Sequence, residues 1–515
     1  MKKIIILSIA AFSALFTACN AQLDTDQHGV TGVDAYYKTD SDADEAITTV
    51  YYQWQAGTMP FFYLLNLPSD DMYAGGLRRG ANAAIEGLAD YTYDMGNSHV
   101  KSVFTNLYQM VYRCNAILDN LDPQTPKQKQ VVAEAHFFRA WAYFYLTGLW
   151  GTPPLADHVL TPSEYLQPNC DSETLWTFIE EDLKTAINSG ALAKKSNAND
   201  EQVRITETAA QAMLGKAYIW HKKWDDARKV LDEVINSKKY ELYKGDYGEI
   251  LVSSTDFCCE SVLETNVIRD AANKMTSMIW QQTGNLRGEL FDWSGQDDID
   301  YATTGYGQAT PRMDLYNAFV EREGKDGYRL NHTILTYEQI KSHGIKIKKG
   351  SKLEQNDGLF SYKWRYSKAD LNGSNSAMCT DYRFMRYAEV LLLAAEAHLQ
   401  SGGDASKALN YVNQIRERAQ LAPLSSVTMD DVKIEKRLEL CYENVRFMDL
   451  VRWGDAKTAL ANKGREIGTF TDDEIWNPKG FVYQVGGFVE GKHNLLPFPE
   501  TEMSVNTLLT QNPNW

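Results

Sequence analysis

The segment 208–237 constrains the fold more than any other part of the sequence, because its apolar and small residues recur at the spacing of two consecutive helices. Gly215 and Ala227 are small enough to let two antiparallel helices approach closely, and Tyr218 is placed to pack against a following pair. One such pair cannot bury its apolar face alone, so several pairs must stack. The pattern consists of Leu214, Gly215, Tyr218, Ala227 and Leu231, with the turn His221-Lys222-Lys223-Trp224 between the helices.

These positions fall at places seven, eight, eleven, twenty and twenty-four of a tetratricopeptide unit. A third unit is predicted from Leu107–Leu121 together with Val131–Leu149. Long insertions interrupt the periods, so the sequence predicts a mostly α protein: a tetratricopeptide-like helical-repeat scaffold with a long loop-rich insertion. The second, looser unit comprises Leu392, Ala395 and Leu399, the turn Ser401-Gly402-Gly403, and then Ala408, Val412 and Ile415.

Changes in composition divide the mature chain, which we expect to form a single domain over 41–515. Helical patterns cover 41–245 and 381–462, although residues 66–98 are rich in Gly, Asn, Asp and Tyr and predict a long surface loop. Between 246 and 380 the helical periodicity fades, which is unusual for a compact domain unless the segment is functional. Residues 463–515 are expected to be mainly irregular.

The N-terminus has the pattern of a bacterial lipoprotein signal. Lys2 and Lys3 precede an apolar run that is too short to span a bilayer, and small residues precede Cys19. We therefore predict a signal peptide over 1–18, lipidation of Cys19 and a polar tether over 19–40. The alternative is an ordinary signal peptide cut near Ala18, with Cys19 an incidental thiol.

Charge and hydropathy exclude two classes of protein. Removal of Lys2 and Lys3 with the signal changes the net charge from −16 to −18, and such a surface repels nucleic acid. The longest apolar run of the mature chain, Val390 to Ala397, is short and contains Glu396, so it predicts a core helix. The mature protein is therefore expected to sit on a membrane by its lipid alone.

Catalytic and metal-binding motifs are missing from the sequence. It has no GxSxG elbow, HExxH motif or Walker loop, and its nine histidines are scattered. Asp297, Asp298 and Asp300 form an acidic patch that we interpret as solvated loop charges, with a Ca²⁺ site as the second choice and glycosidase carboxylates as a further functional reading. We expect no enzyme and no cofactor.

Four stretches, in order, resemble the SusD/RagB family of outer-membrane lipoproteins from Bacteroidetes-type nutrient-uptake systems. The resemblance extends over almost the whole mature chain. It is carried by residues 133–146 (AEAHFFRAWAYFYL) with 150–155 (WGTPPL); by 386–392 (RYAEVLL), 395–397 (AEA) and 413–416 (NQIR); by 434–440 (IEKRLEL) with 446–453 (RFMDLVRW); and by 496–499 (LPFP) with 511–515 (QNPNW).

The resemblance implies a tetratricopeptide-like scaffold that carries a variable, loop-rich binding face. It also implies an outer-membrane protein facing the cell exterior, which docks as a lid on a SusC-like TonB-dependent β-barrel transporter. The charged residues of the motifs invite a catalytic interpretation, but their helical spacing favours ion pairs between helices. These residues are Glu435, Arg437, Glu439, Arg446, Asp449 and Arg452.

If the ligand is a glycan, the useful aromatic residues lie in irregular segments, because sugars stack their C–H faces on rings and direct hydroxyls at polar groups. Two segments qualify, 70–97 and 278–308, and the resemblance places ligand sites on comparable loops. Four other tryptophans occupy helical patterns and are predicted to be core: Trp54, Trp141, Trp220 and Trp453. The predicted ligand contacts are Trp280, Trp293, Tyr301, Tyr306, Tyr73 and Arg78.

The sequence thus favours glycan capture for a transporter. Three alternatives stay open at this point: a peptide-binding member of the same family, as in RagB; a tetratricopeptide scaffold that binds a protein segment; and, last, an enzyme that attacks glycans. The tryptophans and tyrosines of 278–308 favour sugar over peptide. The identity of the glycan does not follow from the sequence.

Overall fold

The computed structural model describes residues 36–267, 286–292, 305–365, 380–471, 477–482 (backbone only) and 486–515. Its helices are α2 (Asp40–Ala56), α3 (Thr58–Asn66), α4 (Ala83–Asp90), α5 (Ser98–Asn120), α6 (Pro126–Trp150), α7 (Ser172–Asn188), α8 (Glu207–Trp220), α9 (Trp224–Asn236), α11 (Met313–Glu323), α12 (Tyr328–Thr333), α13 (Tyr337–Ser342), α14 (Tyr387–Gln400), α15 (Ala405–Arg418), α16 (Met429–Leu440), α17 (Arg446–Trp453), α18 (Ala456–Ala459) and α19 (Glu500–Val505). Its strands are β1 (Met72–Gly75), β2 (Ser261–Glu264), β3 (Phe291–Asp292), β4 (Gln308–Pro311), β5 (Ile334–Thr336), β6 (Lys346–Ile347), β7 (Lys352–Glu354), β8 (Leu359–Ser361), β9 (Arg383–Arg386), β10 (Glu466–Thr471) and β11 (Asn477–Val482).

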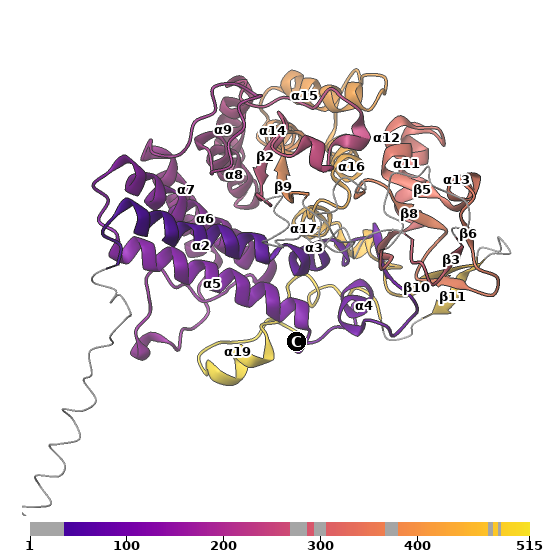
Figure 1. Cartoon of the computed structure of the whole chain (residues 1–515), viewed down its shortest axis with the longest axis horizontal. Helices are drawn as coiled ribbons and strands as arrows, with labels where there is room; N and C mark the ends of the chain where they lie inside the picture. The colour runs from indigo at the N-terminus through magenta and orange to yellow at the C-terminus, as the bar shows by residue number, and fades with distance from the viewer. Residues whose placement is uncertain (1–35, 268–285, 293–304, 366–379, 472–476, 483–485) are drawn as a thin grey trace, which may run out of the picture.

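The helices stack in the order of the chain, as the repeat pattern predicts. Neighbouring contacts run from α2 and α5 through α6 and α7 to α8 and α9, and α9 then packs against α14; Figure 1 shows this succession across the left and centre of the molecule. Local sequence sets where the helices begin. Thr39 and Thr125 each form a capping box at the starts of α2 and α6, and Pro126 occupies the first turn of α6.

The predicted close approach of the helices α8 and α9 is confirmed at Gly215. A Cβ atom on Gly215 would lie 2.5 Å from the Cδ2 and Cγ atoms of Leu231, so the leucine occupies the space that a side chain would need. Ala227, on the same face of α9, is fully buried. The turn between the helices spans His221–Lys223, where Lys222 adopts a left-handed φ of +58°. The pair is therefore packed as a tetratricopeptide unit.

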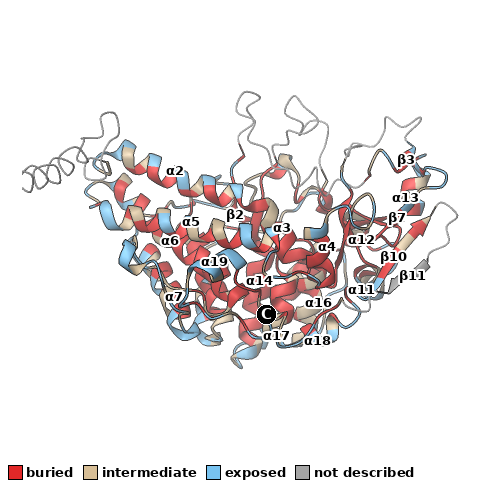
Figure 2. Ribbon diagram, turned by 90° about the horizontal axis from the view of Figure 1, so that it is seen from below, coloured by how far each residue is buried: buried red, intermediate tan, exposed pale blue. Residues whose placement is uncertain are grey.

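Helix α14 forms the centre of the core. It is apolar almost all round and buried along nearly its whole length, as Figure 2 shows in red. Its two buried glutamates are neutralised by neighbouring helices: Glu389 pairs with Lys216 at 2.9 Å, and Glu396 accepts from Arg452 Nη2 at 2.7 Å. The second predicted unit, α14 with α15, packs around its turn at Gly402.

The strands form small antiparallel sheets rather than one large sheet. Among the described residues, β1 pairs with β4, β2 with β9, β3 with β6, β5 with β8, and β10 with both β7 and β11. Most of them gather at the right-hand end in Figure 1, beside α11–α13. This end has a second hydrophobic cluster, which includes Phe291, Ile340 and Phe360.

Three segments that composition predicted to be loops or irregular contain regular secondary structure. The segment 66–98 is not a long surface loop, because it holds β1 and α4 and its residues 66–75 are buried. The segments 246–380 and 463–515 contain more regular structure than composition suggested, including the eleven-residue helix α11 and the strand β10. The mostly α fold is confirmed, whereas the division into signal, tether and one domain stays a prediction.

The four tryptophans predicted to lie in the core differ in how far they are buried. Trp54 and Trp141 are buried, with ring centroids 6.0 Å apart. Trp220 and Trp453 are only partly buried, and the Arg452 guanidinium lies 4.5 Å and 4.7 Å from their ring centroids. Within the described part of the chain, no helix combines the length and apolar character needed to cross a bilayer.

Replacing Gly215 with valine tests the helix packing. Gly215→Val should lower the free energy of unfolding by about 1–3 kcal/mol, because the new side chain overlaps Leu231 in a packed core. Gly288→Ala is the matched control: nothing lies within 4 Å of its added Cβ, so a change of about 0.5 kcal/mol or less is expected. Urea denaturation measures both, and equal stabilities of the two variants would contradict the packing described.

Candidate functional site

The strand pair β1–β4 brings together the two segments that the sequence predicted for ligand binding. Gly75 lies opposite Gln308 in the antiparallel register, and the Gly76 amide donates to the Gly307 carbonyl oxygen at 2.8 Å. Gly75 has a φ of +67°, and a Cβ there would lie 2.4 Å from the Gly307 oxygen, so this contact requires glycine. The surface beside this strand pair is the candidate ligand site.

Tyr306 is the predicted contact that the structure places on this surface. Tyr306 is 40% exposed and directly precedes Gly307 in the sequence. The Arg287 guanidinium lies 5.4 Å from the ring centroid, and its Nη1 donates to the Tyr306 carbonyl oxygen at 3.5 Å. Arg78 is exposed in the turn after β1. An exposed ring beside a guanidinium group has the chemistry needed to stack a sugar and to donate to its hydroxyls.

Tyr73 is not the exposed loop aromatic that the sequence suggested. It lies in β1, is only 6% exposed, and its hydroxyl donates to Asp357 Oδ1 at 3.3 Å while accepting from the Gly468 amide at 3.3 Å. The Arg312 guanidinium covers its ring at 5.0 Å. Burial and the Asp357 carboxylate together raise the pKa of Tyr73 well above its usual value. Tyr73 is therefore a buried structural residue of β1, and its ring does not face a ligand.

The acidic pair Asp70 and Asp71 is also structural. Arg446 holds Asp70 with two bonds, of 2.9 Å and 2.8 Å, and Arg437 Nε donates to Asp71 Oδ1 at 2.9 Å. Burial alone would raise the pKa of Asp70, but Arg437 and Arg446 outweigh it and hold the pKa below its usual range. Arg437 and Arg446 thus form ion pairs as expected, but their partners lie in the turn between α3 and β1 rather than on a helix. These pairs anchor the chain immediately before β1.

Several predicted residues lie outside the described part of the chain. They are the tryptophans and tyrosine expected to contact ligand, the acidic patch considered for Ca²⁺, and the lipidation site, so their roles stay predictions. The residues are Trp280, Trp293 and Tyr301; Asp297, Asp298 and Asp300; and Cys19.

The sequence predicted only part of the buried ion-pair network inside the helical scaffold. Arg386 is 1% exposed, and its guanidinium contacts the carboxylates of Glu443, Glu439 and Glu260. Burial would raise the pKa of Glu439, yet the guanidinium groups of Arg418 and Arg386 lower it to about 2. The sequence signal was present in the charges of 386–392 and 434–440, but Glu260 lies in neither motif.

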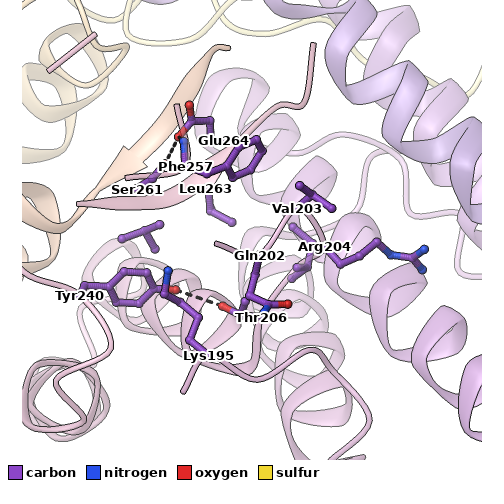
Figure 3. Close-up of a pocket in the computed structure, with 12 residues that line it drawn as sticks. Lys195, Gln202, Val203, Arg204, Thr206, Tyr240, Phe257, Ser261, Leu263 and Glu264 are labelled. Carbon is purple, nitrogen blue, oxygen red and sulfur yellow. Dashed lines mark hydrogen bonds between the residues drawn. The ribbon is translucent and has the colours of Figure 1, made fainter. Parts of the chain in front are cut away.

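The cavity between β2 and the segment 195–206 is too small for a sugar. Figure 3 shows it lined by Lys195, Tyr240 and Glu264, with the Tyr240 hydroxyl bonded to Thr206. Its volume is about 20 Å³, which accommodates a water molecule and not a ring of sugar size. We assign no function to this cavity.

Comparison with known families matches both halves of the chain. The model described as "SusD family" matches residues 259–515, and the model described as "Starch-binding associating with outer membrane" matches residues 35–219. The chain belongs to the SusD family. This agrees with the resemblance seen in the four sequence stretches.

Curated SusD relatives are similar over most of their length. A SusD-like protein of Bacteroides ovatus is 24% identical, with 99% of this chain and 97% of the relative covered. The starch-binding protein SusD of Bacteroides thetaiotaomicron is 22% identical, with 84% and 82% covered. Among solved structures, a laminarin-binding SusD-like protein has a TM-score of 0.76 at 25% identity, covering 93% of this chain and all of that one.

A further SusD-like neighbour supports the fold alone. The surface glycan-binding protein A of Bacteroides thetaiotaomicron, solved in complex with laminarihexaose, has a TM-score of 0.73 at 20% identity and covers 92% of this chain and all of its own. The helical scaffold of this SusD-family chain is therefore similar to that of its neighbours.

Asp256, Glu264 and Asp381 form a carboxylate cluster in which metal-ligand oxygens lie within 4.8 Å of one another. Oxygen ligands of this kind suit a hard cation such as Ca²⁺. However, Arg383 already contacts two of them, Glu264 at 2.9 Å and Asp256 at 3.4 Å, so a cation would share the cluster with a guanidinium. Burial, followed by the charges of Glu264 and Asp256, raises the pKa of Asp381 to about 9.

The raised pKa of Asp381 predicts a loss of stability with rising pH. The folded chain holds this proton more tightly than the unfolded chain, so the contribution of Asp381 is full below about pH 4 and is lost as pH rises towards 9. Asp381→Asn should flatten the dependence of unfolding free energy on pH in this window by up to about 1.4 kcal/mol per pH unit. Urea denaturation at several pH values measures it; identical slopes for both proteins would contradict the assignment.

Proposed function

We propose that this protein is a cell-surface glycan-binding lipoprotein that captures an oligo- or polysaccharide at the β1–β4 surface and delivers it, chemically unaltered, to a SusC-like TonB-dependent transporter. The observation that carries the proposal is the pairing of β1 with β4, which joins the two predicted segments next to the exposed Tyr306 and its neighbour Arg287. Family membership supports it, because relatives are named for binding starch and laminarin.

The arrangement favours binding over catalysis. Carboxylates of the segments that form the β1–β4 surface are paired with arginine: Asp70 with Arg446, Asp90 with Arg79, and Glu289 with Arg287. Asp357 accepts from Tyr73 and from the Met313 amide. A glycosidase needs two carboxyl groups facing the scissile bond, one of them able to donate a proton. We therefore propose that the site only binds, and that Trp280, Trp293 and Tyr301 extend its aromatic surface.

The proposed anchor and partner complete this function. A lipid on Cys19 would hold the protein at the outer membrane, facing the cell exterior, within reach of a transporter. Fractionation of cells that produce Cys19→Ala tests the anchor: the variant should leave the membrane fraction, whereas Cys170→Ala, which removes a half-buried thiol of the folded body, should not. Retention of Cys19→Ala in membranes would contradict lipidation at this residue.

Removing the Tyr306 ring tests the ligand site. In affinity electrophoresis of the acyl-free protein through gels containing laminarin, starch or other polysaccharides, we expect retardation on at least one glycan. Tyr306→Ala should weaken that binding about tenfold, or about 1.4 kcal/mol, because a stacking face is lost. Tyr52→Ala, which removes a tyrosine 55% exposed on α2, is the matched control and should bind as the wild type.

The outcomes separate the proposal from its alternatives. Binding that Trp280→Ala or Trp293→Ala also weakens extends the site to these residues. Lack of retardation on every glycan, together with binding of peptides, would overturn glycan capture in favour of a peptide-binding member of the family. Cleavage of a retained glycan would overturn the claim that the ligand leaves unaltered.

A further inference from the structure

We propose that this protein has a second carbohydrate-binding site, in a tyrosine-lined cleft between the segment 238–245 and helix α15. The inference rests on the proposed function for its class of ligand, a glycan, but on different residues for its location. The cleft has a volume of about 650 Å³, within the range of small-molecule sites. Its walls include Tyr240, Tyr243, Tyr328, Tyr387, Gln414 and Gln420.

The tyrosine rings of the cleft are held in fixed orientations. Tyr240 and Tyr387 are buried and stacked, with centroids 6.3 Å apart and ring planes 27° apart. The Tyr243 hydroxyl donates to Glu249 Oε2 at 2.8 Å, and the Tyr328 hydroxyl accepts from the Tyr247 amide at 3.0 Å. Rings that are already ordered lose little conformational entropy when a ligand stacks on them. The aromatic part of the cleft is therefore preorganised.

Polar groups with spare hydrogen-bonding capacity line the same cleft. In the described part of the chain, the Tyr387 hydroxyl makes no hydrogen bond, and the buried Nε–H of Arg418 has no acceptor. Gln414 uses its amide nitrogen on Asn410 at 2.7 Å, which leaves its carbonyl oxygen to accept from a ligand hydroxyl. Aromatic faces flanked by amides and hydroxyls are the complement of a sugar ring, which has apolar C–H faces and hydroxyl edges.

The charges around the cleft indicate a neutral ligand. Lys238 and Lys244 are balanced by Glu241 and Glu417, and Lys244 pairs with Glu241 at 2.9 Å. The guanidinium of Arg418 is likewise neutralised by buried carboxylates. The cleft therefore has no excess of either charge that would attract a polyanion or a polycation. We therefore assign the cleft to a short segment of a neutral oligosaccharide.

The cleft and the β1–β4 surface share no residue. The cleft is built from α12, α14, α15 and the segment after α9, and α9 and α15 lie at the top of Figure 1, away from the strand-rich end. Tyr240 lines both the cleft and the small cavity of Figure 3, where its hydroxyl is bonded to Thr206. A long glycan bound at the β1–β4 surface would gain a second point of attachment, and the two sites together would bind it more tightly than either alone.

Calorimetric titration of the acyl-free full chain with laminarihexaose and with maltohexaose tests this inference. The wild type should bind two molecules of one probe per chain. Tyr243→Ala, which removes a wall of the cleft, and Gln414→Trp, which fills it, should each reduce the stoichiometry to one. Tyr243→Phe keeps the ring and is the matched control, with two sites expected. Thermal unfolding of each variant confirms that it is folded.

Each outcome decides between the two sites. Loss of the remaining site in a Tyr243→Ala, Tyr306→Ala double variant supports both. A wild-type stoichiometry of one that Tyr306→Ala abolishes and Tyr243→Ala leaves unchanged would overturn the cleft and leave the proposed function intact. Lack of binding of both hexasaccharides and of the polysaccharide panel would overturn the proposed function, and the cleft with it.

Discussion

The fold depends on Arg386, a guanidinium buried at the centre of the molecule. Its partners Glu260, Glu439 and Glu443 come from the segment before β2, from α16 and from the turn after α16, so one side chain ties together distant parts of the chain. Glu439 also contacts Arg418 and Arg329. Burying so many charges is stable only when every partner is in place. The network therefore permits one arrangement of these helices and opposes alternatives.

This constraint separates the scaffold from the binding surfaces. The charged residues of the helical motifs form ion pairs inside the fold. Arg446 and Arg437, for example, pair with Asp70 and Asp71 directly before β1. The two proposed ligand sites use tyrosine rings and hydrogen-bonding groups at the edges of the scaffold, including the guanidinium of Arg287. Both the β1–β4 surface and the cleft beside α15 follow this pattern, with a tyrosine held in place by the structure beneath it.

The sequence predicted the scaffold well, because helix packing is set by local spacing. The small residue Gly215 and its partner Leu231 are sixteen positions apart and lie on adjacent helices, so their contact follows from periodicity alone. The site was predicted in part. Its two segments were identified, but Tyr73 was misassigned because a short strand buried on both faces gives no alternation to recognise.

The cleft was not predicted at all, for a physical reason. Tyr243, Tyr328, Tyr387 and Gln414 come from four separate segments, and each taken alone looks like an ordinary helix or loop residue. Only the packing of α15 against α14 and α16 gathers the elements around it. Glu260 escaped notice similarly, because its partner Arg386 lies 126 positions away. Contacts of this range depend on the tertiary fold and leave no local pattern.

Hydrogen–deuterium exchange with and without a bound oligosaccharide tests the central claim, that a rigid scaffold presents ligand sites at its edges. Our account predicts slower exchange on binding in 72–79, 286–292 and 305–308, with the amides of α6, α8 and α14 already slow and unchanged. Protection confined to the helices α6–α9, with none in 286–292 or 305–308, would contradict it and would place the ligand in the helical groove.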